Sequence, residues 1–113
     1  MSKDKRSAKA YINDIKWAID DIMSFVSGMS YEEFCKDKKT IYAVIRCLEI
    51  IGKASKHVPK EIRNKYPQIP WSQMAGMRDI LIHGYFGIDM GLVWDTVIND
   101  IPKLKEDIQN MRD

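Results

Sequence analysis

The sequence predicts an all-α fold, an up-down bundle of four main helices with a short extra helix and a proline-rich connector. Apolar residues recur at spacings of three and four over several long stretches, as on the buried face of a helix. Helix start and stop signals bracket these stretches. No stretch alternates apolar and polar residues as a half-buried strand does. The 113 residues are enough for a single domain, residues 1–113, with a modest core.

The first helix is expected from Ser7 to Ser27, with Gly28 as its natural end. Its apolar stripe consists of Tyr11, Ile15, Ala18, Ile19, Ile22, Met23 and Val26. Ser30 and Glu33 then form a capping-box pattern, in which each side chain bonds the other's backbone N–H. A short helical piece is therefore expected to run through Lys36.

The second long helix is expected to begin near Asp37, an N-cap candidate, and to end at about His57. Its stripe is Ile41, Val44, Ile45, Leu48 and Ile51, and small residues beside it suggest close helix–helix approach: Gly52, Ala54 and Ser55. Glu49 lies one position off the stripe, so it either lines the edge of a cleft or is an ordinary surface carboxylate. His57 is expected to interact with the helix dipole.

Residues 59–70 read as a connector. Lys60–Lys65 can form a turn of helix after Pro59, and Tyr66–Trp71 is expected to be extended by its prolines. The most basic stretch of the chain begins before this connector and extends into it, and it is either a solvated face or a track for phosphates: Lys53, Lys56, Lys60, Arg63 and Lys65.

A core helix is expected from Ser72 to about His83, and the last helix follows Asp89 as its N-cap. Pro102 falls inside the last helix and predicts a kink or a fresh start near Asp100. The apolar side of this helix is predicted to consist of Leu92, Val93, Val97, Ile98, Ile101, Leu104, Ile108 and Met111.

Charge, cysteine content and apolar runs limit the classes of function that the chain can have. A net charge of +2 and a pI near 8.5 mean that any nucleic-acid contact must come from a local patch, which counts mildly against RNA as substrate. Cys35 and Cys47 are predicted to be reduced, partly buried thiols. No set of His, Cys and carboxylates has metal-ligand spacing, so neither a metal nor a cofactor is expected. Without a signal peptide or a membrane-spanning apolar run, the chain is expected to be cytoplasmic.

The candidate catalytic residues lie in residues 77–86, where Arg78, Asp79, His83 and Tyr85 are interleaved with apolar residues. Arginine offers a fixed fork to phosphate oxygens, and histidine can move a proton near neutral pH. Asp79 and His83 are i,i+4 neighbours, whereas Arg78 and His83 are about 140° apart on an ideal helix. They converge only if the helix loosens before Gly84 or if a second copy of the chain completes the site.

Purely structural interpretations of these residues also remain open. Arg78 and His83 could form a structural charge cluster that holds helices together. Tyr85 could be a half-buried aromatic residue that anchors a helix end.

The pattern Arg78-x4-His83-Gly84-Tyr85, preceded by Ile69-Pro70-Trp71 and by Leu48–Ala54, resembles the HepT-type toxin ribonucleases of the HEPN group. The resemblance extends from about Tyr11 to Leu104. It implies a homodimeric HEPN-like bundle with the motif at the dimer cleft, acting on mRNA or tRNA as a metal-independent endoribonuclease.

The resemblance also implies catalytic roles for Arg78 and His83, with Asp79 in support. It further implies a type VII-like toxin–antitoxin system, in which a minimal nucleotidyltransferase antitoxin silences the toxin by attaching AMP to Tyr85. The expected partners are RNA, a second copy of the chain and this antitoxin, which could form a larger assembly with the dimer. The rival function is a non-catalytic helical partner that presents a substrate to a nucleotidyltransferase.

Overall fold

The computed structural model describes residues 7–77 and 89–111, and all regular structure in these ranges is helical. The elements are α1 (Ala8–Phe25), α2 (Tyr31–Lys36), α3 (Lys38–His57), α4 (Lys60–Lys65), α5 (Trp71–Ala75), α7 (Met90–Asp95), the π-helical turn η1 (Thr96–Asp100) and α8 (Ile101–Gln109). The predicted all-α class is confirmed. Of the four expected main helices, the one from Ser72 to about His83 is described only as far as Met77.

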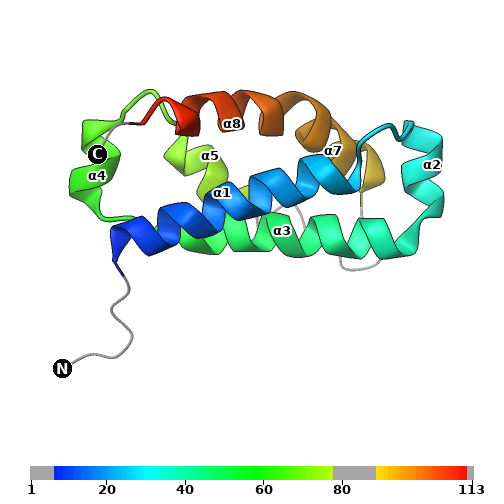
Figure 1. Cartoon of the computed structure of the whole chain (residues 1–113), viewed down its shortest axis with the longest axis horizontal. Coiled ribbons are helices and arrows are strands. Elements are labelled where there is room, and N and C mark those ends of the chain that lie inside the picture. Colours follow the sequence, from blue (N-terminus) through cyan, green and yellow to red (C-terminus); the bar gives the residue numbers. More distant parts are fainter. Residues whose placement is uncertain (1–6, 78–88, 112–113) are drawn as a thin grey trace.

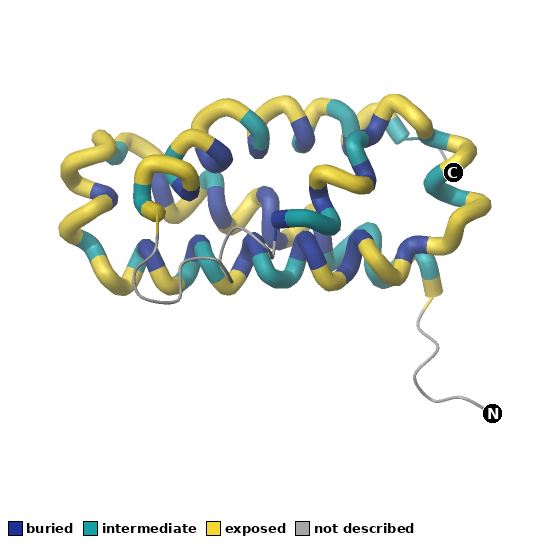
Figure 2. Tube along the Cα trace, turned by 180° about the vertical axis from the view of Figure 1, so that it is seen from behind, coloured by how far each residue is buried: buried dark blue, intermediate teal, exposed yellow. Residues whose placement is uncertain are grey.

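Helices α1 and α3 run antiparallel and pack along their lengths (Figure 1). Helix α8 packs on α1, and helix α5 packs on α3. Lys105 Nζ of α8 lies 3.0 Å from Asp20 Oδ1 of α1 and joins these two helices at the surface. The buried residues lie mainly on the inner sides of the helices, as the burial-coloured trace shows (Figure 2). No helix in residues 7–77 or 89–111 is long and apolar enough to cross a lipid bilayer.

The predicted caps at the second and third helix starts are confirmed, and the first helix start also has a cap that was not predicted. Ser7 Oγ accepts from Ala10 N at 3.1 Å. Ser30 and Glu33 make both capping-box bonds, at 3.1 and 2.8 Å. Asp37 accepts from the backbone N–H of Thr40 at 3.1 Å and from its hydroxyl at 2.8 Å, and these bonds lower the pKa of the Asp37 carboxyl. Each cap satisfies backbone donors that a helix start otherwise leaves unpaired.

The last helix changes its hydrogen-bond pattern next to Pro102, as a proline in a helix requires. Residues Thr96–Asp100 form a π-helical turn, and the backbone stays helical into α8, which has Pro102 in its first turn. The predicted apolar stripe is correct for Val93, Val97, Ile101, Leu104 and Ile108, which are buried. It is wrong for Leu92 and Ile98, which are 42% and 46% exposed. Each lies next in sequence to a buried valine, and a side chain one position along a helix points about 100° away.

The connector differs from the prediction in its second half. Helix α4 forms as expected, with Pro59 at its N-cap. The segment after it turns instead of running extended, because Ile69 N donates to Tyr66 O at 3.1 Å. The indole Nε1 of Trp71 donates to the same carbonyl at 3.0 Å. The turn places Ile69 and Trp71 in the core.

Candidate functional site

The four predicted site residues, Arg78, Asp79, His83 and Tyr85, lie outside the described residues. Their convergence on one site therefore stays a prediction. The structure does define both ends of the segment that carries them, from Met77 on one side to Asp89 on the other.

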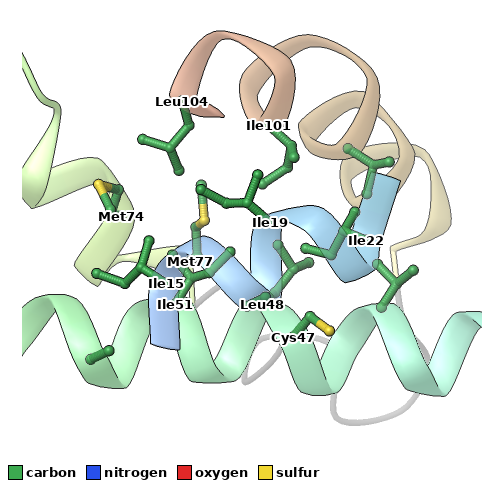
Figure 3. Close-up of a cluster of buried hydrophobic side chains, with 14 of the residues drawn as sticks. Ile15, Ile19, Ile22, Cys47, Leu48, Ile51, Met74, Met77, Ile101 and Leu104 are labelled. Carbon is green, nitrogen blue, oxygen red and sulfur yellow. The ribbon is translucent and has the colours of Figure 1, made fainter. Parts of the chain in front are cut away.

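The N-terminal end of the motif segment is anchored in the core. Met77, the residue immediately before Arg78, is 2% exposed, and Met74 is fully buried. Both methionines belong to the central apolar cluster, in which Ile15 and Ile51 also lie (Figure 3). The motif thus begins directly at a buried side chain.

The C-terminal end of the motif segment is held by a helix cap. Asp89 Oδ1 accepts from Leu92 N at 3.0 Å and starts α7, as predicted. Trp94 of α7 packs on Phe34 of α2, with ring centroids 5.0 Å apart, and Val93 is fully buried. Residues 78–88 are therefore bracketed by a core methionine and by a capped, packed helix.

A small pocket of about 100 Å³ lies beside the start of the motif segment. Met74 and Met77 form part of its floor, and the polar side chains around it come from α5, η1 and α8: Gln73, Asn99, Asp100 and Lys103. Lys103 donates to Asp107 at 3.0 Å, and this bond raises the pKa of its amine.

A larger groove of about 640 Å³ runs between α1 and α3. Glu49 lines it, which confirms the cleft-edge interpretation of this residue, and lies 3.5 Å from Arg46. The charged lining is mixed, with carboxylates in excess: Asp14, Asp21, Glu49, Arg46 and Lys53. A polyanion would be repelled by the acidic side of this groove.

The two cysteines lie in different environments. Cys47 is buried, and burial raises the pKa of its thiol to about 11. Cys35 is exposed, so the prediction of a partly buried thiol is wrong at this position. Helix α2 is only six residues long, and Phe34 alone of its side chains is buried, which leaves Cys35 facing outward. Within the two described ranges, no three His, Cys, Asp or Glu side chains could hold a metal ion.

His57 interacts with the end of α3 as expected. Its Nδ1 lies 2.9 Å from Lys53 O. Its ring also stacks on Tyr11 of α1, with centroids 5.1 Å apart and an interplanar angle of 23°. The sequence contained no signal for this stack, because the two residues are 46 positions apart and meet only through the antiparallel packing of α1 and α3.

Comparison with known proteins identifies the family. Residues 15–111 match the family model described as "Ribonuclease HepT-like". A relative from Methanocaldococcus jannaschii named "Putative RNase" is 51% identical over 95% of this chain and 92% of its own length. "Probable ribonuclease HepT" from Thermococcus cleftensis is 51% identical over 96% of this chain and 98% of its own. No solved structure matches the chain. The matches confirm the resemblance and the expected enzyme class, and the chain belongs to the HepT-like ribonuclease family.

Proposed function

We propose that the chain is the toxin of a toxin–antitoxin pair, an endoribonuclease that needs no metal ion and whose site is built from Arg78 and His83 with Asp79 in support. The observation that carries the proposal is the Arg78-x4-His83-Gly84-Tyr85 motif, which falls inside the residues that match the family. The buried Met77 directly before it and the Asp89 cap after it give this segment two fixed ends.

The proposed reaction is internal transesterification of RNA. The 2′-oxygen attacks the adjacent phosphorus while one imidazole takes the 2′-hydroxyl proton. The bond from phosphorus to O5′ breaks, and a protonated imidazole gives its proton to O5′. The products are a 2′,3′-cyclic phosphate and a 5′-hydroxyl end. One His83 from each of two subunits would supply both roles, which is the chemical reason for a homodimer.

Arg78 has the electrostatic role in this scheme. Its guanidinium would neutralise the charge that builds on the phosphoryl oxygens in the transition state, a contribution of roughly 3 kcal/mol for a preorganised donor. Asp79, four residues before His83, would orient the imidazole and favour its protonated form.

The proposed off-switch is AMP attached to Tyr85 by a minimal nucleotidyltransferase antitoxin. The phenol oxygen attacks the α-phosphorus of a nucleoside triphosphate, and pyrophosphate leaves. The added nucleotide is a bulky anion that would compete with RNA phosphate for Arg78. Cytoplasmic location and a larger assembly with the antitoxin belong to the same proposal.

Cleavage of total RNA in EDTA tests the nuclease. The wild-type chain, purified without antitoxin, is expected to cut RNA, and His83→Ala is expected to be inactive. Intact RNA in both samples would instead favour a non-catalytic partner of the nucleotidyltransferase. Intact mass after co-expression with the antitoxin tests the switch: the wild type should gain whole AMP units, and Tyr85→Phe should gain none. Equal masses would remove Tyr85 from the proposal.

A further inference from the structure

One end of the molecule carries a concentration of positive charge that the proposed site does not use. It comprises the C-terminal part of α3 and helix α4, with Lys53, Lys56, Lys60, Arg63 and Lys65, and is here named the basic corner. Residues 53–65 contain one carboxylate, Glu61, so their net charge is +4 with His57 neutral. The whole chain is +2, which leaves −2 for all other residues together.

No ion pair between described residues involves a cation of the basic corner, although Lys53 shares the lining of the groove between α1 and α3 with three carboxylates. The ion pairs in this part of the chain join Arg46 to Glu49, Lys103 to Asp107 and Lys105 to Asp20. Its four lysines are exposed. Arg63 is half-buried, and its Nε atom is buried without a hydrogen-bond partner among the described residues. The corner therefore presents a local positive potential in a chain that is only weakly basic overall.

Aromatic rings also belong to this end of the molecule, and Lys65 Nζ lies 5.6 Å from the centroid of the Tyr66 ring. His57 and Tyr11 form the stacked pair described above, beside Lys53 and Lys56. The carbonyl of Lys53 can only accept, so Nδ1 of His57 donates the hydrogen of this bond. Cations interleaved with aromatic faces are the combination that binds single-stranded nucleic acid.

We propose that the basic corner binds the phosphate backbone of the RNA on which the proposed nuclease acts, outside the cleavage motif; the inference thus rests on the proposed function. The backbone crosses the end of α3 and α4. Lys53 also lines the groove between α1 and α3, but the rest of that groove is less favourable to phosphate, because its lining has three carboxylates and only two cations. Along the chain, residues 66–70 and α5 connect the basic corner to Met77, the residue before Arg78.

The opposite end of α3 offers a matched control. Lys36, Lys38 and Lys39 are also exposed, but Glu32, Glu33 and Asp37 lie close to them in the chain. Seventeen residues separate Lys39 from Lys56, which is roughly 26 Å along the helix axis. Figure 1 shows α2 and α4 at opposite ends of the molecule. These three lysines match three of the corner, Lys53, Lys56 and Lys60, in number and exposure, and differ from them in charge surroundings.

The test is binding of a labelled single-stranded RNA of about 20 nucleotides, measured by fluorescence anisotropy between about 50 and 200 mM salt. His83→Ala is the common background, so that RNA stays intact. The triple variant Lys53→Gln, Lys56→Gln, Lys60→Gln is expected to weaken binding at low salt by about tenfold or more. The slope of log K against log salt should fall by about 2, since each lost phosphate contact removes about 0.7 for single strands. The control triple Lys36→Gln, Lys38→Gln, Lys39→Gln should change affinity by less than about twofold.

One further variant and one measurement separate charge from folding. The triple variant Lys53→Arg, Lys56→Arg, Lys60→Arg keeps the charge and should retain the affinity of the parent chain. Thermal unfolding of each variant shows whether the lysines act by stabilising the ends of α3 and α4 instead. Equal loss of affinity in both glutamine triples, or no RNA binding by the parent chain, would overturn the inference. Failure of the proposed function looks different: RNA bound through the basic corner but left uncut by the wild type.

Discussion

Met77→Ala tests whether a core anchor positions the motif. Met77 is 2% exposed and is followed directly by Arg78. Truncation of a buried methionine to alanine costs about 2–5 kcal/mol, because apolar burial is lost and a cavity remains. At roughly 4 °C per kcal/mol for a domain of this size, a loss of about 3 kcal/mol lowers Tm by roughly 12 °C.

Met74→Ala is the matched control, because Met74 is fully buried in the same cluster but lies three residues farther from the motif. Both variants should lose similar stability. Under conditions in which both are fully folded, Met77→Ala should lower the RNA cleavage rate by about tenfold more than Met74→Ala, because small displacements of catalytic groups are costly. Met77→Leu, which conserves volume, should retain the rate.

The measurements are thermal unfolding by circular dichroism and single-turnover cleavage of a labelled RNA. Equal cleavage rates for Met77→Ala and Met74→Ala would refute the idea that Met77 sets the position of Arg78. A stability loss confined to one of the two variants would refute the shared-core placement.

Three further predictions follow from the described residues. Gly28 has φ +76° and open space where a Cβ would stand. Gly28→Ala should therefore lower the free energy of unfolding by about 1 kcal/mol through backbone strain alone, and Gly28→Asn should lower it less. Urea denaturation measures both changes. Thiol titration at neutral pH should label Cys35 in the native chain but Cys47 only after unfolding, since Cys47 is buried with its pKa raised to about 11; fast labelling of both would contradict its burial. The pKa of Asp37 is lowered in the folded chain, so its cap stabilises above the unfolded pKa and the effect is lost as pH falls through the folded pKa. Asp37→Ala should therefore have a lower Tm than the wild type at neutral pH, and the difference between the two Tm values should shrink in acid. A difference in Tm that does not depend on pH would argue against a stabilising role of the ionised Asp37 carboxylate.

Sequence reasoning was most successful where local chemistry decides the structure. Ser30, Asp37 and Asp89 each cap a helix as predicted, because a cap depends on residues three positions away. The irregular, π-helical turn that ends at Asp100 lies where Pro102 predicted a departure from regular helix. These elements needed no knowledge of the tertiary fold.

The errors arose where packing or turn geometry decides. Leu92 and Ile98 are apolar and lie next to buried residues, yet they face outward. Tyr66 accepts two hydrogen bonds that close a turn, which the prolines alone did not indicate. The motif itself could be recognised from residue types and spacing, but the meeting of Arg78 and His83 depends on a helix end or on a second subunit, which residue spacing does not specify.

The most direct test of the nuclease uses one defined RNA with a 2′-deoxy substitution at the mapped cleavage position. With the wild-type chain in EDTA, the account predicts rapid cleavage of the all-ribose RNA to a 2′,3′-cyclic phosphate. It predicts no cleavage at the substituted position, and a loss of at least about a hundredfold for Arg78→Ala and for His83→Ala. Cleavage at the 2′-deoxy position at an unchanged rate, or wild-type rates from both variants, would contradict it.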